Sequence, residues 1–395
     1  MNETPYNGRA MTRLVRAGQD RSPHKETSEA LFLTSGFVYD TAEEARARFA
    51  KEAPGYAYTR NANPTIAQFE ARLAAYEGAP AARATPTGMS AVMTALMSGV
   101  RAGDHVVAAR ALFGSCAWII ETLLPRFGVE TSLVDGPDLD AWAAAMRSNT
   151  KAVFFETPSN PMLEVIDIRA VSALAREAGA RVIVDNVFAT PALQRPLDLG
   201  ADVVVYSATK HIDGQGRVMG GAVLGADVFI GADVYDFTRH TGQTLSPFNA
   251  WVLTKGLETL ELRVERMAHN AARVADALAD SPKVERVFYP GRADHPQHAI
   301  AAEQMASGGT LVAVELKGGR DAAFGFLDAL NLVDISNNLG DAKSLATHPA
   351  TTTHKDLSED ARAALGISPS AVRLSIGLED ERDLLDDIAK ALDAV

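Results

Sequence analysis

A chain of 395 residues is too long for one ordinary domain, and its 47% apolar and 22% charged residues are typical of a globular protein with a sizeable core. The formal net charge of −12 argues against nucleic acid and anionic membranes as partners, because both repel an acidic protein. The single cysteine, Cys116, excludes an intramolecular disulfide and a cysteine-based zinc cluster, and we expect no metal site. Residues 1–30 lack the apolar core of a signal peptide, and no run of about 18 apolar residues occurs, so we expect a cytoplasmic protein.

The N-terminal part of the chain, residues 1–60, is predicted to form a segment that contacts a neighbouring subunit. Its first half, residues 1–30, is polar and contains two prolines. This composition fits an extended arm on a neighbour and a disordered segment equally well. A helix is predicted over residues 41–51, with Thr41 as its N-cap.

Two loops with many hydrogen-bonding side chains precede the next helices. The first, residues 56–65, is rich in aromatic residues and asparagine, and its proline begins a helix that ends near residue 76. The second, residues 84–90, leads into an apolar helix over residues 91–100. Thr87 and Gly88 at that helix start offer free N–H groups that suit a phosphate, although glycine is also common there for conformational reasons alone.

From residue 105 onward, short apolar strands alternate with helices. The strands are predicted over residues 105–109, 129–134, 152–156, 181–185, 203–206 and 221–224, and the helices over residues 114–127, 139–146 and 167–179. This alternation is typical of an α/β domain with a mostly parallel sheet and helices on both faces. We predict this large domain over residues 61–255.

The pattern changes in the last third of the chain. A long helix is predicted over residues 249–280 and leads out of the large domain. Strands over residues 284–289, 310–316 and 372–375 then occur with helices over residues 322–329 and 379–394. This order predicts a smaller C-terminal α+β domain over residues 256–395.

One strand is followed directly by residues that could carry chemistry. The strand over residues 203–206 runs into Ser207, Thr209 and Lys210, and Asp185 ends the strand before it. Open α/β sheets bind ligands beyond the carboxyl ends of their strands, so both side chains are expected at one edge. There, Lys210 could condense with the aldehyde of pyridoxal phosphate while Asp185 faces its pyridine nitrogen. Taken alone, a solvated lysine and a turn-capping aspartate are the alternatives.

Six segments along the chain extend this interpretation. They are Tyr58-Thr59-Arg60-x-x-Asn63-Pro64-Thr65, Thr87-Gly88-Met89, Pro158-Ser159-Asn160-Pro161, Asp185-Asn186, Ser207-Ala208-Thr209-Lys210 and Arg373-Leu374-Ser375-Ile376-Gly377. Together they resemble the Cys/Met-metabolism family of pyridoxal-phosphate enzymes, over about Tyr56 to Glu379; many members have serine where this chain has Thr87. The resemblance implies the α/β fold of the fold-type-I transferases, which have a large domain with a mostly parallel sheet and a smaller C-terminal domain.

The resemblance also implies a role for each motif residue. Lys210 would form the Schiff base and move protons, and Asp185 would pair with the pyridinium nitrogen. The other residues implied at the cofactor are Tyr58, Arg60, Gly88, Met89, Phe113, Ser207 and Thr209. Those implied at the substrate carboxylate are Arg373, Asn160 and Asn338. Tyr58 and Arg60 would come from a neighbouring subunit, so we expect a homotetramer built as a dimer of active dimers.

Two departures from the family pattern concern the reaction. Phe113 stands where most members have a tyrosine that is thought to assist the lyases, and phenylalanine cannot transfer a proton. Asn338-Leu339-Gly340-Asp341-x-Lys343-Ser344 is similar to the sulfhydrylases rather than to the lyases or cystathionine γ-synthases. The chain also lacks the extra length of the typical O-acetylhomoserine sulfhydrylases.

The resemblance therefore implies an enzyme of methionine biosynthesis that replaces the γ-substituent of O-succinylhomoserine with sulfide, giving homocysteine and succinate. Cystathionine γ-synthase and O-acetylhomoserine sulfhydrylase are the alternatives, followed by a methionine or cystathionine γ-lyase. A degenerate, non-catalytic site is disfavoured because Asp185, Lys210 and Arg373 are all present. We expect structural roles for His211 and Cys116, and we place the loop over residues 348–354 at the edge of the active site.

Overall fold

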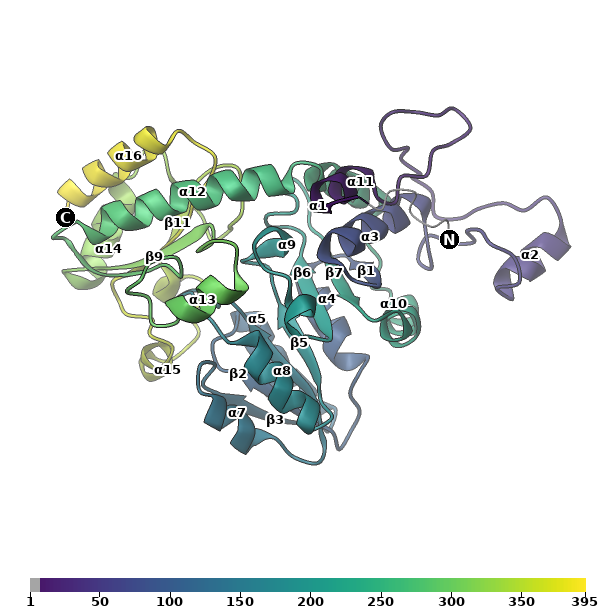
Figure 1. Ribbon diagram of the computed structural model, residues 1–395, viewed down its shortest axis with the longest axis horizontal. Helices are drawn as coiled ribbons and strands as arrows, with labels where there is room; N and C mark the ends of the chain where they lie inside the picture. Colours follow the sequence, from purple (N-terminus) through teal and green to yellow (C-terminus); the bar gives the residue numbers. More distant parts are fainter. Residues whose placement is uncertain (1–7) are drawn as a thin grey trace.

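The computed structural model describes residues 8–395, which form two sheets with helices packed around each (Figure 1). Residues 1–7 of the predicted arm lie outside the described residues. Within the described part, no helix is long and apolar enough to cross a membrane.

The larger sheet has seven strands in the order β1-β7-β6-β5-β4-β2-β3. Their bounds are β1 Ala81–Thr85, β2 His105–Ala109, β3 Glu130–Val134, β4 Thr150–Glu156, β5 Arg181–Asp185, β6 Val203–Ser207 and β7 Gly221–Gly225. Strands β2 to β6 are mutually parallel, and β7 runs antiparallel to both of its neighbours. The predicted mostly parallel sheet is therefore confirmed.

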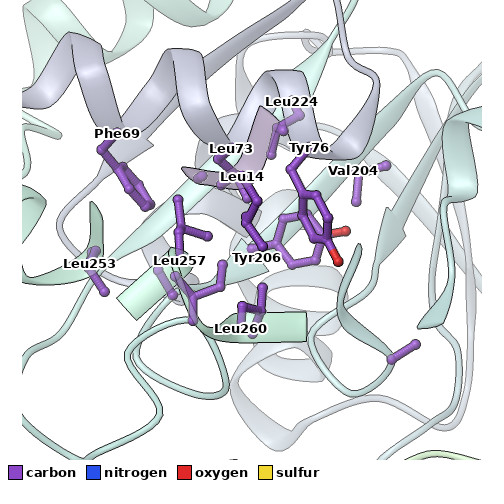
Figure 2. Close-up of a cluster of buried hydrophobic side chains, with 14 of the residues drawn as sticks. Leu14, Phe69, Leu73, Tyr76, Val204, Tyr206, Leu224, Leu253, Leu257 and Leu260 are labelled. Atoms are coloured by element: carbon purple, nitrogen blue, oxygen red, sulfur yellow. The ribbon is translucent and has the colours of Figure 1, made fainter. Parts of the chain in front are cut away.

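Helices cover both faces of this sheet because alternate strand residues point to opposite sides. Val203 and Val205 pack with helix α4 (Gly88–Met97), whereas Val204 and Tyr206 pack with helix α3 (Pro64–Glu77). Figure 2 shows the second of these clusters. The other helices on the large sheet are α5 Gly114–Trp118, α6 Leu124–Arg126, α7 Leu139–Ala145, α8 Ile168–Glu177, α9 Thr190–Leu193, α10 Tyr235–Thr241 and α11 Pro247–Leu257.

The sequence missed strand β1, part of which was predicted as the loop over residues 84–90. Its residues Ala81-Ala82-Arg83-Ala84-Thr85 include three alanines, and alanine is depleted in strands. The segment is extended because it pairs along its whole length with β7, from Ala81 opposite Gly225 to Thr85 opposite Gly221. A tertiary partner thus overrode a weak local preference.

The described part of the predicted arm is not a loose extension. Helix α1 (Ala10–Arg16) places Leu14, which is fully buried, against Phe69 and Leu73 of α3 (Figure 2). This corrects the prediction that residues 1–30 form an extended arm or a disordered segment. Met11, Leu14 and Val15 follow the helical i, i+3, i+4 spacing, but the helix has only seven residues, so this repeat is a weak signal in a polar segment.

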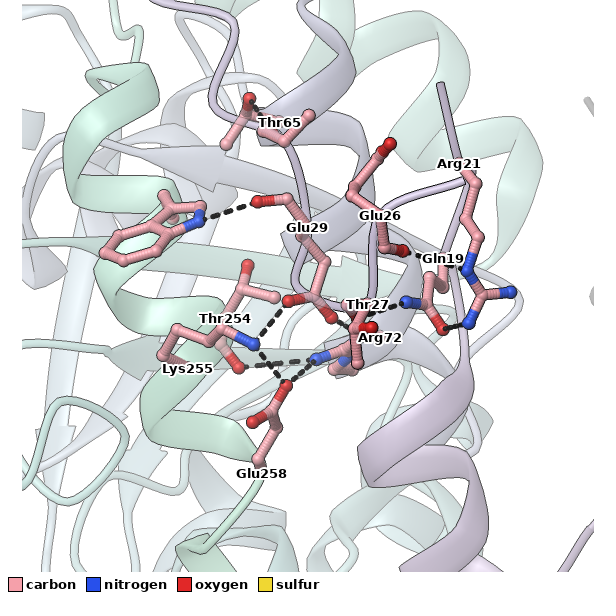
Figure 3. A network of polar contacts seen from close by, with 12 residues as sticks. Gln19, Arg21, Glu26, Thr27, Glu29, Thr65, Arg72, Thr254, Lys255 and Glu258 are labelled. Atoms are coloured by element: carbon pink, nitrogen blue, oxygen red, sulfur yellow. Dashed lines mark hydrogen bonds and ion pairs between the residues drawn. The ribbon is translucent and has the colours of Figure 1, made fainter. Parts of the chain in front are cut away.

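A buried ion network holds the end of the same segment (Figure 3). The Glu29 carboxylate lies 2.7 Å from the Arg72 guanidinium and 2.5 Å from Lys255 Nζ. Although burial opposes it, hydrogen bonds from Lys255 and Arg72 lower the pKa of Glu29. Beyond this anchor, residues 31–60 project from the body and carry helix α2 (Ala42–Phe49) with the predicted Thr41 N-cap (Figure 1).

The smaller sheet has five strands in the order β10-β11-β12-β9-β8. Their bounds are β8 Val284–Phe288, β9 Leu311–Leu316, β10 Asp334–Ile335, β11 Leu345–Thr347 and β12 Ala371–Ser375. The helices of this region are α12 Leu260–Ala279, α13 His298–Gln304, α14 Gly319–Ala329, α15 Glu359–Ala364 and α16 Glu381–Asp393. Side chains of α12, α14 and α16 form one apolar cluster with the sheet.

The long helix predicted over residues 249–280 is in fact two helices. Thr259 has φ −118° and ψ 9°, which interrupts the helix between α11 and α12. The interruption lets α11 pack beside α3 on the large sheet while α12 runs to the small sheet (Figure 1). The domain boundary at residues 255/256 stays a prediction.

Candidate active site

The candidate site is a cavity of about 410 Å³ at the carboxyl edge of the large sheet. Strands β5 and β6 are parallel neighbours, so Asp185 at the end of β5 and Lys210 just after β6 reach the same edge. Nine residues predicted for the site line the cavity: Gly88, Met89, Phe113, Asn160, Asp185, Ser207, Thr209, Lys210 and Arg373. The fold therefore brings together residues that are distributed over most of the chain.

Lys210 lies in the cavity beside Asn338, which follows strand β10 of the smaller sheet. Its Nζ donates a hydrogen bond of 2.6 Å to Oδ1 of Asn338. Burial, together with repulsion from Arg373, lowers the pKa of Lys210 to about 8. An amine with this pKa is substantially neutral near pH 8, which is the state that attacks a carbonyl or accepts a proton.

Asp185 is a half-buried carboxyl that forms no ion pair within the described residues. Its Oδ1 accepts a 3.0 Å hydrogen bond from the backbone N–H of Val187, and burial raises its pKa. A second carboxyl, Glu156 at the end of β4, lies within 4.8 Å of it. Burial and repulsion from Asp185 raise the pKa of Glu156 as well. Two neighbouring carboxyls that lack a cation in the described structure suit a positively charged group such as a protonated ring nitrogen.

The N-terminus of α4 brings free backbone N–H groups to the cavity wall, which suits an anion. The N–H groups of Gly88 and Met89 make no hydrogen bond within the described residues, because the Thr87 cap binds the N–H of Ser90. A Cβ on Gly88 would lie 2.5 Å from that of Ser207, so only glycine allows the helix to approach so closely. Free N–H groups at a helix start, beside a serine hydroxyl, are a ready site for a phosphate.

Arg373 of β12 is a buried cation without a carboxylate partner among the described residues. One Nη donates at 2.8 Å to Oδ1 of Asn160, and the other donates to the backbone carbonyls of Asn337 and Asn338. Its Nε has no partner, and burial lowers its pKa to about 10. A guanidinium held in this way by neutral acceptors remains available for an anionic ligand in the cavity.

Tyr58 and Arg60 do not line the cavity of their own chain. They line a separate shallow hollow with Leu33, Ser35 and Pro247, and 44% of Tyr58 is exposed. The Arg60 guanidinium lies 5.4 Å from the centre of the Tyr58 ring. These two predicted cofactor residues are therefore presented at the surface, beside the projecting segment over residues 31–60.

Four further residues near the site test the remaining sequence interpretations. Phe113 lines the wall, and its N–H donates at 2.7 Å to Glu156. Cys116 is buried in α5 as expected, which raises its thiol pKa, although it also lines the cavity. His211 points away and its Nε2 lies 2.7 Å from the Thr310 hydroxyl, in keeping with a structural role. Thr353 lines the cavity, which places the loop over residues 348–354 at its edge.

Sequence reasoning missed Glu156, and it placed the loop over residues 348–354 at the site without singling out Thr353. Glu156 could have been found, because it ends an apolar strand just before the Pro158–Pro161 motif, as Asp185 ends the next strand. Thr353 lies in irregular backbone, and no local signal in the sequence indicates where its side chain lies.

One cavity holds a lysine with a lowered pKa, an aspartate, free N–H groups at a helix start and a buried arginine. This combination is typical of the amino-acid enzymes that use pyridoxal phosphate. The chain belongs to the Cys/Met metabolism PLP-dependent enzyme family, whose model matches residues 11–393. The unpaired carboxyl of Asp185 and the free N–H groups of Gly88 and Met89 fit the ring nitrogen and the phosphate of this cofactor.

Individual relatives cover nearly the whole chain. The chain is 54% identical over 382 residues to the O-succinylhomoserine sulfhydrylase of Mycobacterium tuberculosis, which covers 96% of this chain and 94% of the relative. It is 41% identical over 386 residues to an L-methionine γ-lyase of Porphyromonas gingivalis, covering 97% of both. A solved cystathionine γ-synthase of Xanthomonas oryzae pv. oryzae superposes with a TM-score of 0.93 at 36% identity, covering 98% of this chain and 99% of that one.

Proposed function

We propose that the protein catalyses γ-replacement on O-succinylhomoserine, with sulfide as the nucleophile and homocysteine and succinate as products. The observation that carries the proposal is the high identity, over almost the full length, to an O-succinylhomoserine sulfhydrylase. The site agrees with it, because Asn338 of the sulfhydrylase-like motif contacts Lys210 directly. Phe113 stands against a lyase, since it offers no hydroxyl at the cavity wall.

The predicted residues that line the cavity have distinct proposed roles. Bound pyridoxal phosphate supplies a ring that withdraws electrons from the amino-acid substrate. Lys210 holds the cofactor covalently at rest and then carries protons between substrate carbons, a task suited to its lowered pKa. Asp185 would pair with the ring nitrogen, and Phe113 would contact the ring from the cavity wall. The phosphate is bound by the following groups: the N–H groups of Gly88 and Met89, and the hydroxyls of Ser207 and Thr209.

The substrate is held from the other side of the cavity. Arg373 binds the α-carboxylate, and Asn160 fixes the guanidinium through their 2.8 Å hydrogen bond. Asn338 orients Lys210 Nζ toward the reacting carbons. In the net reaction, the Cγ–O bond breaks, the electron pair leaves with succinate, and the sulfur of sulfide forms the new Cγ–S bond.

A substrate panel tests this function directly. Purified enzyme with pyridoxal phosphate should form homocysteine from sulfide and O-succinylhomoserine faster than from O-acetylhomoserine. Faster formation of cystathionine from cysteine would point to cystathionine γ-synthase, and a preference for the acetyl ester would point to an O-acetylhomoserine sulfhydrylase. Release of 2-oxobutyrate from methionine without added nucleophile would instead indicate a γ-lyase.

The proposed active unit is a dimer within a homotetramer located in the cytoplasm. Tyr58 and Arg60 are proposed to reach the phosphate of a neighbouring subunit, since they lie outside the cavity of their own chain. The adjoining segment exposes Leu33, Val38 and Phe49 by 67%, 91% and 67%, as expected of a surface that is covered on assembly.

Subunit hybrids test the shared site. R60A and K210A chains, each of low activity alone, should recover about a quarter of wild-type activity when randomly co-assembled, because half of the dimers then contain one intact site of two. D185A co-assembled with K210A is the matched control and should recover nothing, since both residues line one cavity. Failure of the R60A hybrid to recover activity would mean that each chain completes its own site.

A further inference from the structure

A second cavity of about 720 Å³ adjoins the candidate active site. The two cavities share Phe113 and Thr353 in their walls, so Phe113 stands between them. The second cavity is formed by α5, the loop that follows Thr353 and α15, and its wall is largely apolar, with Leu112, Trp118 and Leu357 among its residues. The amino-acid part of a substrate bound to Arg373 would lie in the first cavity, so the second cavity is free for another part of the substrate.

Arg110 is the one cation among the described residues that line this second cavity. It follows β2 directly, and its backbone N–H donates at 2.8 Å to the carbonyl of Val134, which fixes where its side chain begins. Within the described part of the chain, its guanidinium makes no ion pair within 4 Å and no hydrogen bond. Arg110 is exposed to solvent.

Carboxyl groups lie near Arg110, but none of those in the described residues forms an ion pair with it within 4 Å. Asp135 and Glu164 share a smaller cavity with Arg110. Burial and repulsion from Asp135 raise the pKa of Glu164 to about 7, and the charge of Arg110 partly opposes this rise. Glu164 is therefore only partly ionised near neutral pH. Glu121 and Asp356 are exposed to water, which screens them.

The remaining titratable group of the second cavity is a histidine. His354 is buried, and burial lowers its pKa to about 4, with repulsion from Arg373 adding to the effect. It is therefore neutral near pH 7 and does not compete with Arg110 for an anion. An anionic ligand in this cavity would meet one cation, on Arg110.

We propose that this second cavity holds the acyl leaving group of the substrate, and that Arg110 binds the terminal carboxylate of a dicarboxylic acyl chain. The inference rests on the proposed function. Arg373 holds the α-carboxylate in the first cavity, and the acyl chain passes Phe113 into the second, where apolar walls contact its methylene groups. A guanidinium pairs with a carboxylate through two parallel hydrogen bonds, so a succinyl ester gains a contact that an acetyl ester cannot make.

Replacement of Arg110 should change the choice of ester rather than the chemistry. For R110A, we expect kcat/KM with O-succinylhomoserine and sulfide to fall about tenfold, which is the loss of about 1.4 kcal/mol of binding. The value with O-acetylhomoserine should stay within about twofold of wild type, because the acetyl group does not reach Arg110. R169A, which removes an exposed arginine from α8, is the matched control and should change neither value. Equal losses for both esters, or no loss for either, would overturn the assignment.

Binding of succinate provides a readout that does not need turnover. Calorimetric titration of the cofactor-loaded enzyme should show succinate binding, with a dissociation constant that rises about tenfold in R110A and stays unchanged in R169A. An equal dissociation constant for succinate in R110A and in the wild type would contradict the inference. If wild-type enzyme makes no homocysteine from either ester, the proposed function fails, and the succinate titration still decides whether Arg110 binds a dicarboxylate.

Discussion

Replacing Lys210 with alanine is expected to lower kcat by at least about 10³-fold, because one side chain serves both as covalent anchor and as proton carrier. The Nζ is positioned by its 2.6 Å hydrogen bond to Asn338 and has a pKa lowered to about 8. No other lysine lines the cavity among the described residues, so no substitute base is at hand. Homocysteine formation under saturating substrate measures the effect.

A spectroscopic readout separates this loss from unfolding. Wild-type enzyme should show a visible absorption band that survives gel filtration, since Lys210 binds the cofactor covalently, and K210A should lose it. K151A is the matched control, because Lys151 is exposed on β4 and outside the cavity, and it should keep both the band and the activity. A K210A enzyme that retains more than about a tenth of wild-type kcat would contradict the assignment.

Removal of the Arg373 guanidinium should weaken substrate use by about 10²- to 10³-fold in kcat/KM, since truncating a buried charge partner costs about 2–5 kcal/mol. The group is 2% exposed, has no carboxylate partner in the described structure and lines the cavity. It is therefore held in place for an anion that arrives with the substrate. We expect R373A to show a raised KM at sulfide saturation, with the cofactor band unchanged.

The stability of a second variant, R373M, tests the physical explanation. Arg373 is buried as an uncompensated charge, with its pKa lowered to about 10, so its burial opposes folding. Its three hydrogen bonds to Asn160, Asn337 and Asn338 offset that cost. A methionine of similar length should thus leave the melting temperature within a few degrees of wild type. A large fall in melting temperature with an unchanged KM would show a purely structural role.

Much of the fold was predictable because the large sheet is built from uninterrupted apolar strands such as Val203–Ser207 and Arg181–Asp185. The apolar residues of such a strand are consecutive in the sequence, so the strand is recognisable without knowledge of the fold. Helix α1 and strand β1 were missed, because α1 is a seven-residue helix in a polar segment and β1 depends on pairing with β7. The break at Thr259 likewise follows from two helices that pack on different sheets.

The same division applies to the candidate site. By itself, the sequence determined which reactive side chains stand at strand ends and helix starts, since Asp185, Lys210 and Gly88 follow or begin elements that local patterns predict. Its motifs also pointed to Arg373 and Asn338 through resemblance. Each of these residues was therefore identifiable before any spatial relation between them was known.

Only the tertiary structure decided which of these side chains meet. Lys210 contacts Asn338 across 128 residues, Glu156 lies against Asp185, and Arg110 faces a cavity behind Phe113. Contacts such as that of Lys210 with Asn338 arise because the carboxyl edge of the large sheet packs against the region of the smaller sheet. The physical reason is that the charge state of a buried group depends on its neighbours in space, and local sequence does not specify them.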